Sequence, residues 1–278
     1  MSAAVERGIL LYTRGEFFAA HEAWEERWRE ATDGDERRAL QGLIQVAAGY
    51  FKIFGQQRGE AGARLLRRGA DKLAAGPAAL FGLALAQFAG AVRASATAGG
   101  VAPLLRYQGY YCEENAALLG RHPALAGREP ALVFVRAAGE SCVLWAQRVA
   151  EEPGEPVLWD YHVFVLTRAP WQVWDLDTTL GCPAPAAEYL RRTFRPELRL
   201  PPEVRPRFRV VPAAELATFA SDRSHMRGPD GAFTQPPPPW PPLGEGSTLA
   251  RFLALDDPIA GEEHTLDSLV AHVTREHF

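Results

Sequence analysis

Hydrophobic and polar positions follow a helical period in the first third of the chain. One stripe, spaced at i, i+3, i+7 and i+11, predicts a helix over residues 16–31 and consists of Phe17, Ala20, Trp24 and Trp28. Similar stripes predict three further helices, around residues 40–51, 65–73 and 79–94. No strand pattern precedes residue 95. We therefore predict a small all-α helical bundle over residues 1–95.

The composition changes after this helical region. Residues 95–100 read SATAGG, a run of small side chains that is typical of a flexible link. Strand-like apolar runs begin only in the sequence that follows it. We predict three parts: a helical domain over residues 1–95, a linker over 96–103 and a second domain over 104–278.

Two apolar runs in the second domain predict a β-hairpin. Residues 157–166 and 171–175 are rich in β-branched and aromatic side chains, and between them lie Thr167, Arg168, Ala169 and Pro170. If these four residues form the loop, Leu166 pairs with Trp171, and His162 lies opposite Asp175. Cross-strand partners point to one face, with Cβ atoms roughly 4.5–5.5 Å apart. A buried imidazole that faces a carboxylate is held in one tautomer and made more basic, as a general base requires.

Cys112 is the candidate nucleophile. It precedes residues 113–121, whose early acidic residues and apolar centre suit the first turns of a helix. A thiol at a helix N-terminus near an imidazole is expected to have a lowered pKa. Cys112, His162 and Asp175 would then supply the groups for thiol acyl transfer. Structural alternatives remain open, because a single cysteine is often a buried hydrophobe, a strand histidine a core residue, and an aspartate a strand cap.

Charge and composition exclude some functions. The 278-residue chain has a net charge of −4 and no basic run, whereas nucleic-acid binding needs a concentrated positive face. Its 3 cysteines lack framework spacing, which indicates free thiols in a reducing compartment. Residues 76–92 are apolar but short and interrupted by Gln87, so a buried helix is favoured over a membrane span. The N-terminal residues do not resemble a secretory signal. We expect a cytoplasmic protein without nucleic-acid or membrane partners.

Six sequence blocks carry a family resemblance. In order and spacing they resemble protein N-terminal glutamine amidohydrolase: YYCEEN (110–115), VLWDYHV (157–163), VWDLDTTL (173–180), RVVPA (209–213), FASDRSHM (219–226) and PPPPWP (236–241). The similarity extends over about residues 104–278. Departures from the family pattern are Trp240, where a tyrosine is common, the short turn before Asp175, and residues 181–183. They affect the expected shape of the pocket rim and leave the candidate catalytic residues in place.

The resemblance implies a fold and a reaction. It implies an α/β domain related to papain and the transglutaminases, so that the whole chain is α+β, and a triad of Cys112, His162 and Asp175. It also implies hydrolysis of the side-chain amide of an N-terminal glutamine in proteins or peptides, through a cysteine thioester and without a metal or organic cofactor. Two alternatives share these residues: acyl transfer or proteolysis by the same triad, and peptide binding without catalysis.

The helical domain also resembles a known family, one of small helical proteins of unknown function. The resemblance lies in residues 15–28, which include the motif HEAWE, and in residues 40–45, and it covers about residues 5–75. His21, Glu22 and Glu25 could share a helix face and bind a metal. A face with one histidine and many carboxylates and arginines is more often solvated or ion-paired. We expect an interaction or stabilising module whose partner is unknown.

Other polar and proline-rich stretches lie near the predicted site. Asp222 is a candidate to receive the α-ammonium of the substrate, although a turn held by Asp222 and Arg223 is the alternative. The proline run at 236–239 is expected to form a stiff wall beside the site. Cys142 lies among apolar residues and is expected in the core, and Cys182 lies among prolines without a recognisable acid–base pair.

Overall fold

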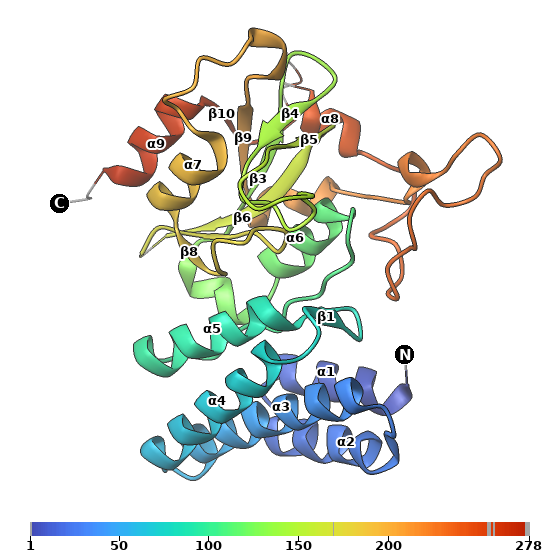
Figure 1. Ribbon diagram of the computed structural model, residues 1–278, viewed down its shortest axis with the longest axis vertical. Coiled ribbons are helices and arrows are strands. Elements are labelled where there is room, and N and C mark those ends of the chain that lie inside the picture. Colours follow the sequence, from blue (N-terminus) through green and yellow to red (C-terminus); the bar gives the residue numbers. More distant parts are fainter. Residues whose placement is uncertain (1, 169, 255–256, 258, 276–278) are drawn as a thin grey trace. The chain divides into compact units, whose positions relative to one another are not determined.

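The computed structural model describes residues 2–168, 170–254, 257 and 259–275, which belong to two compact units (Figure 1). One unit comprises Met1–Tyr107 with His122–Ala124, and the other comprises Gln108–Arg121 with Leu125–Phe278. The boundary therefore differs from the predicted linker over residues 96–103. Helix α5 (Leu85–Ala98) continues into that stretch, and Ala102 and Leu104 are buried.

The first unit consists mainly of helices: α1 (Ala3–Thr13), α2 (Phe17–Glu30), α3 (Gly34–Tyr50), a π-helical turn (Phe51–Gly55), α4 (Gly59–Ala74) and α5. The helices predicted around residues 16–31, 40–51 and 65–73 are confirmed, whereas α1 was not predicted. The fourth helix starts later than predicted, because β1 (Ala79–Leu80) and β2 (Leu83–Ala84) form a hairpin. Phe81 and Gly82 between them both have positive φ, as a tight two-residue turn requires.

The core of the first unit is aromatic. Tyr12 is buried and its ring contacts those of Trp24, Tyr50 and Phe88. The predicted stripe on α2 thus faces inward, at least at Phe17, Ala20 and Trp24, which are buried. In the part of the chain that the structure describes, none of the helices is both long enough and apolar enough to cross a membrane.

The second unit is built on a six-stranded antiparallel sheet in the order β10-β9-β3-β6-β7-β8. Its strands are β3 (Ala131–Arg136), β6 (His162–Thr167), β7 (Gln172–Trp174), β8 (Ala184–Pro185), β9 (Arg207–Pro212) and β10 (Glu262–Thr265). A separate pair consists of β4 (Cys142–Leu144) and β5 (Val157–Trp159). The helices are α6 (Cys112–Gly120), α7 (Ala186–Phe194), α8 (Leu249–Leu253) and α9 (Leu266–Thr274), with 3-10 turns at Pro123–Arg128, Pro202–Val204, Ala213–Thr218 and Ser224–Met226.

Both faces of this sheet are covered. Phe164 of β6 belongs to a buried cluster that includes Tyr189 of α7 and Leu269 of α9. Phe134 of β3 points to the other face and packs on Phe252 of α8. Figure 1 shows α7 and α9 on one side of the sheet and α8 on the other. Burial on both faces explains why β3 and β6 read as continuous apolar runs rather than alternating ones.

The fold class agrees with the prediction, with one correction. A helical unit followed by a unit that contains a sheet and helices confirms the α+β class. The relation to papain and the transglutaminases stays a prediction. The strand predicted over residues 157–166 is two strands, because β5 pairs with β4 whereas β6 pairs with β3. Asp160 and Tyr161 interrupt the strand, so β5 belongs to the two-stranded sheet and β6 to the six-stranded one.

Candidate active site

His162 and Asp175 are in contact, but not through the predicted register. Thr167 pairs with Gln172, so the β6–β7 loop runs from residue 168 to 171 instead of 167 to 170; Ala169 within it lies outside the described residues. Thr167 stays in the strand because β-branched residues suit a pleated sheet, and its hydroxyl accepts a hydrogen bond from Trp174 Nε1. The pairing is offset by two residues. An even offset keeps the side chains on the predicted face.

Asp175 is held by several donors. Its Oδ1 atom lies 3.0 Å from His162 Nε2 and accepts the backbone N–H of Asp177 at 2.9 Å. Its Oδ2 atom accepts the Tyr189 hydroxyl at 2.8 Å and Gln147 Nε2 at 3.5 Å. Burial opposes the charged form, but the His162 charge and these hydrogen bonds outweigh it and lower the pKa of Asp175. The carboxylate is therefore charged and fixed in orientation.

The second ring nitrogen of His162, Nδ1, makes no hydrogen bond to the described residues. The imidazole is fully buried, and its Nδ1 atom has no hydrogen-bond partner among the described residues. Trp159 stacks on the ring at a centroid distance of 5.6 Å. Burial lowers the pKa of His162, but the charge and hydrogen bond of Asp175 more than offset this, so the pKa is raised. With Nε2–H donated to Asp175, Nδ1 is left as a proton acceptor.

Cys112 lies beside this pair at the start of α6. Its thiol is 5% exposed and lines a cavity of about 10 Å³ with Val163, Trp174 and Asp177, among others. Val163 directly follows His162 in the chain, so the thiol lies next to the backbone of His162. Among the hydrogen bonds of the described residues, none joins the thiol to the His162 ring. The structure thus gathers all three predicted residues without a closed thiol–imidazole contact.

The expected lowering of the Cys112 pKa is wrong. Burial raises the pKa of the thiol well above its ordinary value, and the charges of Glu113 and Asp177 add to the rise. The backbone N–H of Val163 offsets only part of it. A thiol that is removed from water beside carboxylates is disfavoured as an anion. Cys112 is therefore a neutral thiol in this environment.

Two acidic residues next to Cys112 are buried, which the sequence did not suggest. The sequence predicts Glu113 and Glu114 only as favourable residues of a first helical turn, yet both side chains are fully buried. Glu114 forms a two-pronged ion pair with Arg223, at 2.7 Å from Nε and 2.8 Å from Nη2, and accepts Trp240 Nε1 at 2.9 Å. In the sequence, this ion pair could be suspected only because Glu113 and Glu114 follow Cys112 and Arg223 lies in the distant block 219–226.

The Glu114–Arg223 pair holds the proline-rich segment in place. Arg223 also donates to the backbone oxygens of Pro238 and Trp240, at 3.4 and 2.8 Å, and Tyr111 donates to the backbone oxygen of Gln235 at 3.1 Å. Both ends of the run 236–239 are therefore fixed to residues adjoining Cys112. This arrangement fits the predicted stiff wall beside the site.

Breaking this buried pair is expected to destabilise the protein. Arg223→Met leaves the Glu114 carboxylate buried and unpaired, which costs about 3–5 kcal/mol. Chemical denaturation followed by circular dichroism measures the change. Arg227→Met, at an exposed arginine of the same segment, is the matched control and should change the stability by less than about 1 kcal/mol. Equal effects of the two variants would contradict a structural role for the pair.

The remaining candidates occupy less direct positions. Asp222 closes a turn, since its Oδ1 accepts the backbone N–H of Ser224 at 2.9 Å, and the Ser224 hydrogen bonds are the main cause of its lowered pKa. Its carboxylate is partly exposed. Cys142 is buried, as predicted for a core residue, and burial raises its pKa to about 12. Cys182 is also buried and free.

One group of side chains among the described residues has the spacing of a metal site. The ligand atoms of His162, Asp175 and Asp177 lie within 4.8 Å of one another, a spacing that could hold a metal ion. Nε2 of His162 is, however, already directed at Asp175, which suits an acid–base pair. His21, Glu22 and Glu25 do not form such a group in the described part of the chain.

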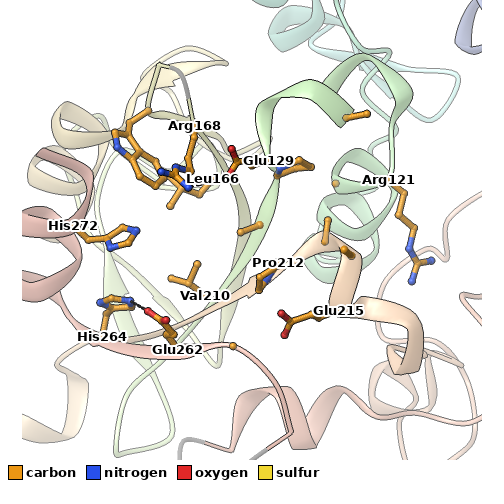
Figure 2. Close-up of a pocket in the computed structure, with 18 residues that line it drawn as sticks. Arg121, Glu129, Leu166, Arg168, Val210, Pro212, Glu215, Glu262, His264 and His272 are labelled. Carbon is orange, nitrogen blue, oxygen red and sulfur yellow. Dashed lines mark hydrogen bonds and ion pairs between the residues drawn. The ribbon is translucent and has the colours of Figure 1, made fainter. Parts of the chain in front are cut away.

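A much larger cavity lies away from these residues. It has a volume of about 990 Å³ and is lined by residues that include Glu129, Arg168, Glu215, His264 and His272. Figure 2 shows His264 and His272 on one side of it and Glu215 on the other. None of Cys112, His162 and Asp175 lines this cavity, so its size alone does not make it the reaction site.

Comparison with known proteins identifies the family. The family model of N-terminal glutamine amidase matches residues 107–273, and a domain of unknown function (DUF309) matches residues 5–65. Proteins named protein N-terminal glutamine amidohydrolase from Drosophila erecta and Drosophila melanogaster are each 40% identical over 153 residues, which cover 51% of this chain and 74% of theirs. The protein of that name from Drosophila grimshawi is 42% identical over 146 residues, covering 49% and 71%. The chain therefore belongs to the N-terminal glutamine amidase family.

Proposed function

We propose that this protein hydrolyses the side-chain amide of N-terminal glutamine in proteins or peptides, leaving glutamate and releasing ammonia. The observation that carries the proposal is the buried His162–Asp175 pair at 3.0 Å with Cys112 beside it. An acceptor nitrogen, an orienting carboxylate and a thiol are the groups that acyl transfer needs. The family membership supports the choice of substrate.

The reaction proceeds through a thioester. His162 Nδ1 takes the thiol proton as Cys112 Sγ attacks the side-chain amide carbon, and a tetrahedral adduct forms. The imidazolium then gives this proton to the departing nitrogen, the carbon–nitrogen bond breaks, and ammonia leaves. In the second half His162 removes a proton from water, which attacks the thioester carbon. The carbon–sulfur bond then breaks, and the imidazolium returns the proton to sulfur, which leaves the glutamate product and the free thiol. Asp175 keeps the imidazole oriented and stabilises its charged form throughout.

The start of α6 is suited to stabilise the oxyanion. Tyr111, the residue before the helix, supplies no side-chain hydrogen bond to the first turn. The backbone N–H groups of Cys112 and Glu113 therefore remain for the negative oxygen that develops on the attacked amide. No metal or organic cofactor enters these steps.

Products separate this function from its alternatives. A peptide that begins with glutamine should release ammonia and gain only the mass of an amide-to-acid change. Peptides that begin with asparagine, or with glycine followed by glutamine, should remain unchanged. A new amide product in the presence of amines would indicate a transglutaminase, and a cleaved peptide would indicate a protease. Binding of the glutamine peptide without turnover would indicate a non-catalytic protein. Mass spectrometry of the full-length protein's products decides among them.

The pH dependence should follow His162. Because the nucleophile is a neutral thiol, the imidazole must be neutral to accept its proton, and its pKa is raised above 6.5. The value of kcat/KM, which reports ionisations of the free enzyme, should therefore fall as the pH decreases through a midpoint above 6.5. A pH profile of ammonia release tests this. A midpoint below 6.5 would mean that another group, or a preformed thiolate, controls the rate.

The proposal also covers the compartment, the partners and the role of the helical unit. The described residues contain free thiols at Cys112, Cys142 and Cys182, which supports the proposed reducing, cytoplasmic environment. Peptides or proteins with N-terminal glutamine are the proposed partners, rather than nucleic acid or membrane. The helical unit contributes none of the proposed catalytic residues, and we propose that it acts as an interaction or stabilising module.

A further inference from the structure

A buried carboxylate beside the nucleophile takes no part in the steps above. Glu113 is the second residue of α6, and its side chain is fully buried. Its Oε2 atom lies 3.9 Å from Cys112 Sγ and accepts the Tyr161 hydroxyl at 3.0 Å. Its Oε1 atom is buried without a hydrogen-bond partner among the described residues. His225 Nε2 is 3.4 Å from Oε1, close enough for an ion pair but outside hydrogen-bond geometry.

We infer that Glu113 receives the α-ammonium group of the substrate. This inference rests on the proposed function and names the residue that restricts it to N-terminal glutamine. A buried carboxylate oxygen without a donor is costly, whereas an ammonium group brings both a positive charge and hydrogen-bond donors. The side chain of His225 borders Glu113 and is 24% exposed, whereas that of Glu113 is fully buried, so His225 separates the carboxylate from solvent on this side.

The length of glutamine fits this arrangement. Four bonds separate its α-nitrogen from the side-chain amide carbon, a span of roughly 5 Å when extended. The carboxylate lies 3.9 Å from the sulfur, the ammonium would lie about 2.8 Å from the carboxylate, and the attacked carbon must come within about 3–3.5 Å of the sulfur. Asparagine, one bond shorter, would leave its carbon about 1 Å out of position, which can cost on the order of 100-fold in rate.

The ammonium group would also ease activation of the nucleophile. After burial, the charge of Glu113 is the largest cause that raises the pKa of the Cys112 thiol. A cation paired with Glu113 offsets that charge, so loss of the thiol proton becomes less costly when the correct substrate is bound. Internal glutamine brings no cation, so the substrate neither offsets the charge of Glu113 nor supplies a donor to Oε1. Asp222 is less suited to this role, because it already accepts the Ser224 amide and is partly exposed.

Two peptides that differ only in the α-amine test the inference. One begins with glutamine and the other with a 4-carbamoylbutanoyl group, which is glutamine without its amine. The full-length protein should favour the first, and in Glu113→Gln this preference in kcat/KM should fall about 10- to 100-fold, because the charge-assisted bond is lost. The ratio cancels any change in the nucleophile itself. Alkylation of Cys112 by iodoacetamide should be as fast in Glu113→Gln as in the unchanged protein, or faster.

Asp222→Asn makes the same chemical change at the rival carboxylate and should leave the preference intact. Loss of the preference in Asp222→Asn, or its retention in Glu113→Gln, would overturn the inference. If Glu113→Gln does not fold, Glu113→Asp retracts the anchor by one methylene and should shift the preference from glutamine towards homoglutamine; an unchanged length preference would again overturn it. Absence of ammonia release from both peptides by the unchanged protein would instead reject the proposed function.

Discussion

Cys112→Ala is expected to abolish ammonia release from glutamine-initiated peptides. The variant has no atom that can attack the amide carbon, and removal of a nucleophile lowers kcat by a factor on the order of 10⁶ in comparable triads. Because the thiol is small and 5% exposed, its loss should leave the fold intact by circular dichroism. Ammonia release under single-turnover conditions gives the most sensitive measurement.

Cys142→Ala is the matched control for this variant. Cys142 is also a buried thiol, and its sulfur makes only a weak hydrogen bond of 3.4 Å to the backbone oxygen of Trp159. The Cys142→Ala variant should keep most of the wild-type rate of ammonia release. Activity that survives in Cys112→Ala would reject the thioester mechanism, and so would equal losses in two folded variants.

Asp175→Asn should lower kcat by about 10⁴ while KM changes little. An amide in place of the carboxylate can present an N–H towards His162 Nε2, which forces the ring proton to Nδ1 and removes the acceptor that Cys112 needs. In the proposed steps the side chain at position 175 does not contact the substrate, so substrate binding is largely unchanged. Steady-state kinetics of ammonia release provides both constants.

Tyr189→Phe removes one hydrogen bond from the same carboxylate and serves as its control. The Tyr189 hydroxyl donates to Asp175 Oδ2 at 2.8 Å, whereas the His162 contact is made by Oδ1. Since the tautomer is preserved, the rate should fall by less than about tenfold. An unchanged kcat in Asp175→Asn would show that the His162–Asp175 contact is structural.

Local pattern predicted much of the fold. Helices around Trp24, Leu43 and Leu66 follow from the helical period of apolar residues, which a helix must bury on one face. The hairpin between His162 and Asp175 follows from two β-branched runs around a short polar turn. The start of α5 was misplaced, because a two-residue turn at Phe81 and Gly82 depends on backbone conformations that apolar spacing does not reveal.

Local sequence is enough to predict that His162 and Asp175 share one face, because side chains alternate along a strand and the predicted register is offset by an even number of residues. It does not predict the actual register of β6 and β7, which is set by the pairing of Thr167 with Gln172. The burial of Glu113 and Glu114 depends on segments that are distant in the sequence. Arg223 and Trp240 reach Glu114 from more than 100 residues away along the chain. Glu113 is enclosed by Tyr161, which is 48 residues away, and by His225. A carboxylate at the start of a helix is solvated unless distant segments of the chain bury it. The residues next to it in the sequence do not show whether such segments are present.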